Sequence, residues 1–226
     1  MMRRIAAAVF ASMLGFSALA QEAGPADDFG GWGDIQLSKN LGGGFYTSLR
    51  AEYRCKNGWS DLDFWYLRPT LGYRFTDWLS AGVCYDYKQY RDEVKHCGLA
   101  FVTGTLKSGQ LTASLREMYV RSYTFEEVAA VPAIYPAPEI PASTTVSVSS
   151  VLRSRLTVQY SDPKTSLKPY LCIEMFSWKS WQNTRHYVGT IVPLCDRCNL
   201  DLFYLYLTRS AGTAEHVLGA GLNISL

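Results

Sequence analysis

Residues 151–176 read VLRSRLTVQYSDPKTSLKPYLCIEMF, and both halves of this stretch alternate with a period of two. In the first half, Leu152 and Leu156 share one face, while Arg153 and Arg155 lie on the opposite face. The second half alternates in the same way after a polar break that is rich in turn residues. A period of two predicts β-strands, and a short polar break between two such runs predicts a hairpin. One face of this hairpin is therefore apolar, and the other carries charge.

The register of this hairpin follows from the position of its loop. Folding the chain about the middle of residues 161–168 aligns the two apolar faces and places Arg155 opposite Glu174. A slip by one residue would turn the charged side chains toward the apolar face. We therefore expect an ion pair between Arg155 and Glu174 inside the fold, with Arg153 as a second donor.

The N-terminus has the three parts of a secretory signal peptide. A basic dipeptide, an apolar run and a small-residue cleavage pattern follow one another in MMRRIAAAVFASMLGFSALA. The apolar run is short for a membrane-spanning helix. The sequence therefore predicts an exported protein with a signal peptide over residues 1–20, followed by a flexible lead over residues 21–31.

The rest of the chain, residues 32–226, shows roughly eleven candidate strands at regular spacing and no convincing helical period. This predicts an all-β fold: a closed antiparallel β-barrel of the transmembrane type, with about 10–12 strands and up-and-down topology. The proline-rich segment at about 124–147 is expected to be a long extracellular loop. In the strand before it, the alternation slips near Glu117, which suggests a β-bulge. The odd strand count leaves open whether an extra strand precedes Trp32 or the N-terminal segment enters the lumen.

The alternation alone does not say which way the apolar face points. In a soluble ligand-binding barrel it would line the cavity, whereas in a membrane barrel it would meet lipid and the charges would fill the lumen. Strand length favours the membrane, since about 9–11 residues are needed for a tilted strand to cross it. Aromatic residues near strand ends also favour it, as at a membrane interface: Tyr53, Trp65, Phe75, Trp78, Tyr87, Tyr160 and Trp178.

The last strand alternates up to Leu226 and resembles the C-terminal signal of outer-membrane barrels. We therefore expect the cell outer membrane as location, with outer-membrane lipid, lipopolysaccharide and the barrel-assembly machinery as partners. A soluble secreted or periplasmic barrel is the alternative. The net charge of +2 is too small to predict nucleic acid as a partner.

In the membrane reading, one face of the strands places many charged side chains in the lumen. The ion-pair network predicted there consists of Arg50, Glu52, Arg54, Arg68, Arg74, Asp86, Arg116, Arg153, Arg155 and Glu174. Asp34 and Lys88 lie on the same face. Such charges either fill a narrow lumen with ion pairs or line a basic pore that favours anions. The specific function is thus predicted to be structural or that of a narrow pore.

A lipid-modifying enzyme of the outer membrane is a third hypothesis. It would need a nucleophile and a base at the lipid-facing rim. The available histidines are His96, His186 and His216, and none lies in a recognisable serine motif. Phosphate loops, dinucleotide fingerprints and metal-ligand clusters are also missing from the sequence, so we expect no catalysis and no cofactor.

Six cysteines in an exported chain could pair, since the periplasm is oxidising. Cys195 and Cys198 flank a two-residue turn, where a disulfide between them is conceivable. A zinc site would need two further ligands, and none is near, so metal is not expected.

Three blocks of the sequence support a family assignment: YRCKNGWSDLDFWYLRPTLGYRF, SRLTVQYSDPKTSLKPYLCIEMF and RHYVGTIVPLCDRCNLDLFYLYL. They resemble domain-of-unknown-function family 2490, barrels of the outer-membrane type from Gram-negative bacteria. The features shared with the family are Trp32, Arg68 before LGYRF, Arg153 with Arg155, Pro169-Tyr170 before Glu174, and Arg185 before Gly189. The CDRC turn departs from the family pattern. The resemblance implies a fold and a location, and it brings no catalytic residues.

Overall fold

The computed structural model describes residues 28–128, 143–210 and 212–226. All its regular elements are β-strands, as the alternation predicted. The strands are β1 (Asp28–Gly42), β2 (Phe45–Lys56), β3 (Asp61–Arg74), β4 (Leu79–Tyr90), β5 (Glu93–Ser108), β6 (Leu111–Val128), β7 (Ser143–Tyr160), β8 (Lys168–Trp178), β9 (Ser180–Cys195), β10 (Cys198–Arg209) and β11 (Ala214–Ser225). Across the described residues, no helix is long and apolar enough to cross a membrane.

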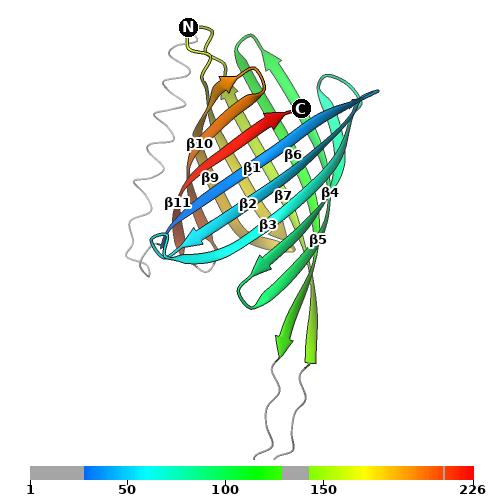
Figure 1. Cartoon of the computed structure of the whole chain (residues 1–226), viewed down its shortest axis with the longest axis vertical. Coiled ribbons are helices and arrows are strands. Elements are labelled where there is room, and N and C mark those ends of the chain that lie inside the picture. The colour runs from blue at the N-terminus through cyan, green and yellow to red at the C-terminus, as the bar shows by residue number, and fades with distance from the viewer. Residues whose placement is uncertain (1–27, 129–142, 211) are drawn as a thin grey trace, which may run out of the picture.

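The eleven strands form one closed barrel, in which each strand pairs with its neighbours in the sequence (Figure 1). The predicted closed, up-and-down barrel is confirmed. One pair departs from the antiparallel prediction, because β1 and β11 run parallel from the pair Asp28 and Glu215 to the pair Ser38 and Ser225. An odd number of alternating strands makes the first and last run in the same direction. The parallel seam is therefore what allows this barrel to close.

Two expected boundaries differ in the structure. β1 begins at Asp28, so residues 28–31 belong to the seam rather than to the expected lead. β6 continues to Val128 and β7 starts at Ser143, and both extend beyond the other strands (Figure 1). The ends of the expected loop at 124–147 are thus strands. Its centre lies outside the described residues, as do the signal peptide and the start of the lead.

The expected β-bulge near Glu117 is absent: β6 keeps an unbroken register with both β5 and β7. Glu117 instead lies on the outward face, where the Ser154 hydroxyl donates a hydrogen bond of 2.7 Å to its Oε2. The break in the alternation near Glu117 therefore reflects a polar residue on the apolar face. The side chains that follow it keep the faces that the period of two assigns them.

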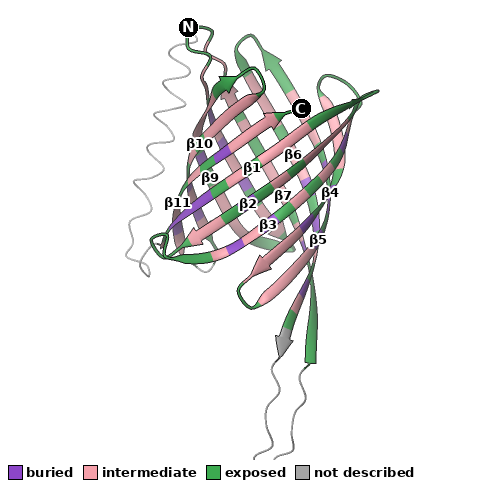
Figure 2. Cartoon of the chain, viewed as in Figure 1, coloured by how far each residue is buried: buried purple, intermediate pink, exposed green. Residues whose placement is uncertain are grey.

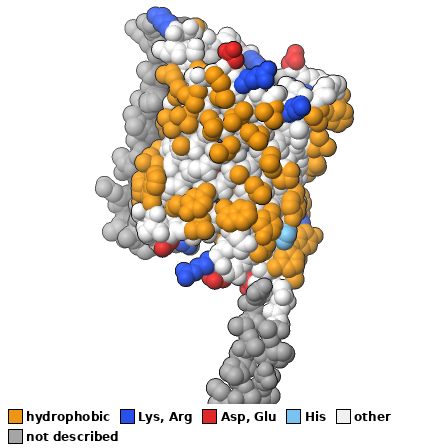
Figure 3. Space-filling view, viewed as in Figure 1, with side chains coloured by type: hydrophobic (Ala, Val, Ile, Leu, Met, Phe, Trp, Pro, Cys, Tyr) orange, Lys and Arg blue, Asp and Glu red, His pale blue; other side chains and the backbone are white. Residues whose placement is uncertain are grey.

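Large apolar side chains lie on the outside of the barrel, and several charged ones lie inside. Leu49, Leu71 and Leu156 are 46–48% exposed, whereas Asp86 is 0% and Glu174 2% exposed. Hydrophobic side chains cover the middle of the face shown in Figure 3, and charged side chains gather toward its two ends. Figure 2 shows buried, intermediate and exposed positions following one another along single strands. This is the reverse of a soluble globular protein, in which charged groups are seldom buried.

Two apolar clusters fill further parts of the interior. One contains Trp32, Tyr170, Cys172, Tyr187, Leu205 and Val217, and the other contains Cys84, Cys97, Leu99, Phe101, Met118 and Val120. The second cluster shows which residues of 98–106 face inward. Leu99 and Phe101 point inward, and Ala100 and Val102 outward.

Four aromatic rings lie over a glycine on the neighbouring strand. The pairs are Tyr46 with Gly72, Phe101 with Gly82, Tyr170 with Gly189, and Phe203 with Gly219. A Cβ atom built on any of these glycines would fall within 2.7 Å of a ring atom. The rings therefore occupy the space that side chains would otherwise take, which is one way in which sheets use glycine to curve tightly.

Gly82 is the position at which this packing can be tested. We expect Gly82→Ala to lower the free energy of unfolding by roughly 1–3 kcal/mol, as overpacking does. The reason is that the added Cβ would lie 2.6 Å from the Leu71 carbonyl oxygen, a backbone atom that cannot rotate away. The measurement is urea unfolding of the purified protein in detergent. Gly98→Ala is the control, because nothing lies within 4 Å of a Cβ there, and an equal loss in both variants would contradict the account.

Candidate functional site

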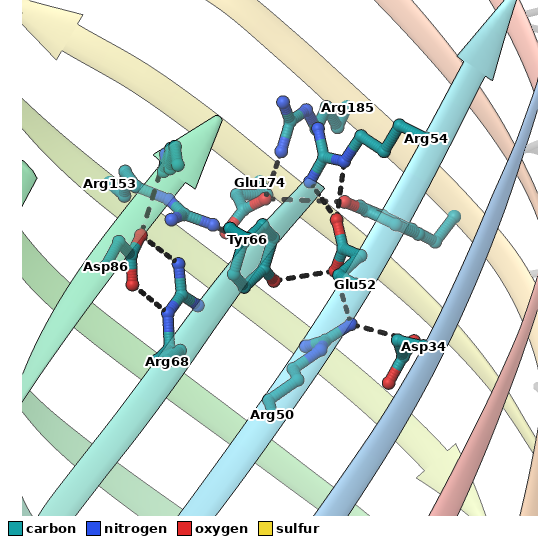
Figure 4. Close-up of polar contacts among 12 residues, drawn as sticks. Asp34, Arg50, Glu52, Arg54, Tyr66, Arg68, Asp86, Arg153, Glu174 and Arg185 are labelled. Atoms are coloured by element: carbon teal, nitrogen blue, oxygen red, sulfur yellow. Dashed lines mark hydrogen bonds and ion pairs between the residues drawn. The ribbon is translucent and has the colours of Figure 1, made fainter. Parts of the chain in front are cut away.

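The candidate site is a layer of ion pairs inside the barrel, built around three buried carboxylates (Figure 4). They are Glu52 on β2, Asp86 on β4 and Glu174 on β8. Each lies on the inward side of its strand because the strand alternates with a period of two. A buried carboxylate is strongly destabilising unless cations and hydrogen-bond donors compensate it. The contacts of each of these three carboxylates therefore determine what the site can do.

Glu52 is held from three sides. Arg54 approaches its Oε1 at 2.5 Å and Arg50 its Oε2 at 2.9 Å. The Tyr66 hydroxyl donates a hydrogen bond of 2.6 Å to Oε2. Arg50 also contacts Asp34 at 3.0 Å, so the cluster extends to β1. All four acceptor directions of the buried carboxylate are thereby well supplied.

Asp86 is bound by the fork of a single guanidinium group. Arg68 donates from Nε to Oδ1 at 2.5 Å and from its terminal nitrogen to Oδ2 at 2.6 Å. Lys88 lies 3.6 Å from Oδ2. Such a two-point contact is the strongest geometry for an arginine and a carboxylate, and it also fixes the orientation of both side chains.

Glu174 has different partners from the expected one. The register of the hairpin is as predicted, with Arg155 opposite Glu174. The ion pair between them is nevertheless not formed. Arg153 binds Oε1 at 2.7 Å, and Arg185, opposite on β9, lies 3.4 Å from Oε2. Arg155 instead donates from Nε to the sulfur of Cys172 at 3.1 Å.

The change of partner has a simple geometric origin. Glu174 lies between two strands, and β9 supplies Arg185 as a second directly opposite cation. Diagonal neighbours are also within reach of a side chain as long as arginine, which allows Arg153 to bind across β7 and β8. The two carboxylate oxygens are used by these residues and by Tyr187, whose hydroxyl lies 3.4 Å from Oε2.

Trp32 connects two parts of this layer across the interior. The guanidinium carbon of Arg54 lies 3.6 Å from the Trp32 ring centroid, and that of Arg185 lies 5.1 Å from it. These residues come from β1, β2 and β9. Arginine stacking on a tryptophan face is favourable because the ring face is electronegative. The layer is therefore tied together through contacts between strands that are not neighbours in the sheet.

The predicted site residues divide into two groups. Arg50, Glu52, Arg54, Arg68, Asp86, Arg153 and Glu174 take part in the ion pairs just described. Arg74, Arg116 and Arg155 make no ion pair with any described residue. The prediction omitted Arg185, although the alternation of RHYVGTIVPL would have placed it on the same face as Tyr187.

The histidines and the CDRC turn lie away from the ion-pair layer. The Tyr85 hydroxyl hydrogen-bonds to His96, the Tyr204 hydroxyl lies 2.5 Å from His216, and His186 lies beside Tyr206. These are tyrosine-rich contacts on the outer surface. No group of three metal-ligating side chains is found among the described residues.

Cys195 and Cys198 face each other across the turn between β9 and β10, and both are free thiols in the structure. A hydrogen bond from Cys198 lowers the pKa of the Cys195 thiol at this exposed turn. A more acidic thiol is oxidised more readily. The disulfide between them stays a prediction.

Fold and site together define a class: a closed eleven-stranded β-barrel with an apolar exterior and an interior layer of buried ion pairs. The chain belongs to the family described as "Protein of unknown function (DUF2490)", whose model matches residues 29–216. The matched segment includes every residue of the ion-pair layer. No curated protein and no solved structure matches the chain significantly.

Glu174 and Arg155 provide a test of the ion-pair layer. We expect Glu174→Gln to lower the free energy of unfolding by roughly 3–5 kcal/mol, because it leaves Arg153 and Arg185 without their carboxylate in a buried position. Arg155→Gln should lower the free energy of unfolding clearly less than Glu174→Gln does, because it breaks no ion pair. Urea unfolding in detergent measures both, and equal losses would show that Arg155 is the true partner of Glu174.

Proposed function

We propose that this protein is an outer-membrane β-barrel with a structural role, whose interior is closed by its own side chains. The observation that carries the proposal is the direction of the alternation: apolar side chains face outward and ion pairs face inward. In water this outer surface would be far larger than the apolar patches that soluble monomers expose. In a bilayer it would face acyl chains, as in known membrane barrels.

The strand lengths and the aromatic residues agree with a bilayer. The strands run from 11 residues in β8 to 18 in β6 and β7, enough for tilted strands to cross the hydrocarbon. Near the turn between β3 and β4, Tyr73 packs against Phe45 and Phe75 with ring centroids 4.7 and 4.9 Å apart. Toward the other end, Tyr119 packs against Trp178 at 5.7 Å. Aromatic belts of this kind lie at the two membrane interfaces.

The last strand supports assembly in the outer membrane. β11 pairs with β10 on one side and with β1 on the other, so it completes the barrel. Leu226 donates a backbone hydrogen bond of 2.8 Å to Ser38, which fixes the chain end at the rim. A C-terminal strand that closes the sheet is a suitable segment for recognition by the barrel-assembly machinery. Lipopolysaccharide and outer-membrane lipid would then contact the apolar exterior.

The ion-pair layer favours a closed interior. The side chains of Arg54, Arg68 and Arg185 are 12–13% exposed, and those of Glu52, Asp86 and Glu174 are at most 3% exposed. Two hollows lie on the outside of the barrel, one over β2 to β7 and the other at the end near the turns before β3 and β5. Small barrels are often filled by their side chains in this way.

Cell fractionation together with heat-modifiable migration tests the location. We expect the mature protein in the outer-membrane fraction, and we expect a shift in electrophoretic migration between unheated and boiled samples in detergent. Folded membrane barrels resist detergent until heated, because their hydrogen bonds are all satisfied within a closed sheet. Recovery as a soluble periplasmic monomer without detergent would contradict the proposal and favour a soluble ligand-binding barrel.

A narrow pore is the second candidate, and the surplus of interior cations favours it. Arg74, Arg116 and Arg155 add positive charge that no carboxylate binds. In planar bilayers we expect no single-channel steps, because the ion-pair layer blocks the interior. Steps with anion preference would instead establish the pore. Steps with cation preference would contradict both candidates.

A further inference from the structure

Two arginines of the barrel interior face each other directly across neighbouring strands. Arg116 on β6 is paired in the register with Arg155 on β7, and both lie on the inward face. Directly opposite residues of an antiparallel pair have their Cβ atoms about 4.5–5.5 Å apart. Like charges on directly opposite residues are destabilising, and more so where water is restricted. Arg50 and Arg68 are also directly opposite on β2 and β3, but each of them binds a carboxylate.

Among the described residues, no carboxylate forms an ion pair with Arg116 or Arg155, although Glu174 lies near enough to attract both arginines. Glu174 is the acid next to Arg155 in the register, but its oxygens bind Arg153, Arg185 and Tyr187. Arg155 uses Nε for the sulfur of Cys172, which leaves its terminal nitrogens free to donate. Arg116 donates no hydrogen bond to any described residue. Guanidinium groups are never deprotonated under ordinary conditions, so the repulsion cannot be relieved by loss of a proton.

Hydroxyl groups surround the two guanidinium groups. Thr103 lies opposite Arg116 on β5, and Ser114 and Thr157 face each other one inward row further toward the β5–β6 turn. None of these three hydroxyls makes a side-chain hydrogen bond to a described residue. All three residues are half-buried, so their side chains keep some exposure to solvent. In the direction away from the β5–β6 turn, the interior is closed by the ion-pair layer.

We propose that Arg116 and Arg155 form a binding site for an oxyanion of the phosphate class, entered from the barrel end that holds the β5–β6 and β7–β8 turns. Two guanidinium groups can each donate two parallel hydrogen bonds to a tetrahedral oxyanion, and this geometry suits phosphate better than a spherical halide. The hydroxyls of Thr103, Ser114 and Thr157 supply further donors. The bound anion would neutralise the like-charge pair, which turns an unfavourable contact into a favourable one. The site is a property of the folded barrel and does not depend on where in the cell the barrel resides.

The test is phosphate binding by the purified, folded barrel in detergent. The dissociation constant of inorganic phosphate is measured by ³¹P NMR titration, and the urea unfolding midpoint is compared between phosphate and chloride at equal ionic strength. We expect saturable binding and a higher midpoint in phosphate, since a ligand that binds only the folded state stabilises it. Glycerol phosphate is titrated in parallel. If it binds as tightly as inorganic phosphate, the site accepts phosphate esters. If it binds more weakly, the ligand is free phosphate.

Arg116→Gln is the decisive variant. It should weaken phosphate binding about tenfold or more, because it removes a charge-assisted contact. Without phosphate, Arg116→Gln should unfold at the same or a higher urea concentration than wild type, because the repulsion between the two arginines is gone. If Arg116 had a structural role instead, the variant would unfold at a lower urea concentration. Arg116→Lys keeps the positive charge but loses the two-point hydrogen bonding of the guanidinium group. Its phosphate affinity should therefore lie between that of wild type and that of Arg116→Gln. If Arg116→Gln fails to fold, Arg155→Gln provides the same comparison of phosphate affinity.

Arg74→Gln is the matched control. Arg74 also faces inward and has no ion pair, but it lies against the ring of Tyr46 near the end of β3, where it opposes Ser80 rather than another arginine. Its loss should leave phosphate affinity unchanged. The proposal is overturned if wild type shows no saturable phosphate binding, if Arg116→Gln binds as tightly as wild type, or if Arg74→Gln weakens binding to the same extent.

Discussion

Closure of the hydrogen-bonded sheet is the constraint on which the rest of the structure depends. In a closed barrel every strand has two neighbours, so no strand edge is left with unpaired backbone groups. With eleven strands that alternate in direction, closure requires one parallel pair, and β1 and β11 provide it over eleven register positions, from Asp28 to Ser38. Parallel pairing is slightly less stable per residue than antiparallel pairing. A long seam offsets this weakness, and it explains why the strand pattern begins before Trp32.

Closure also creates an interior that must be filled. Alternation places Arg50, Arg68 and Arg153 inside, where an isolated charge would be costly. The structure compensates by setting Glu52, Asp86 and Glu174 among them, and the closest cation lies 2.5–2.7 Å from each carboxylate. Elsewhere the rings of Tyr46, Phe101, Tyr170 and Phe203 lie over glycines on adjacent strands. Ion pairs and rings together fill much of the interior.

The exterior shows the opposite distribution, and Glu117 departs from it. Large apolar side chains such as Leu49, Leu71 and Leu156 face outward, as in barrels that lie in membranes. Glu117 is an acid on this face, and Ser154 satisfies one of its oxygens. The pair lies among apolar neighbours such as Val102 and Leu152. It was the residue at which the sequence pattern faltered, and the strand nevertheless continues without a bulge.

The sequence by itself determined the strands, their faces and the local register. A period of two fixes which side chains share a face, and a short loop fixes which residues lie opposite, so the pairing of Arg155 with Glu174 in register followed from residues 151–176 alone. The tertiary structure decided which contacts form. Arg185 reaches Glu174 from β9, and it meets Arg54 at the Trp32 ring, because barrel curvature brings β1, β2 and β9 together. The parallel seam and the opposition of Arg116 to Arg155 were decided in the same way. Both depend on pairings between segments far apart in the chain, which no local periodicity specifies.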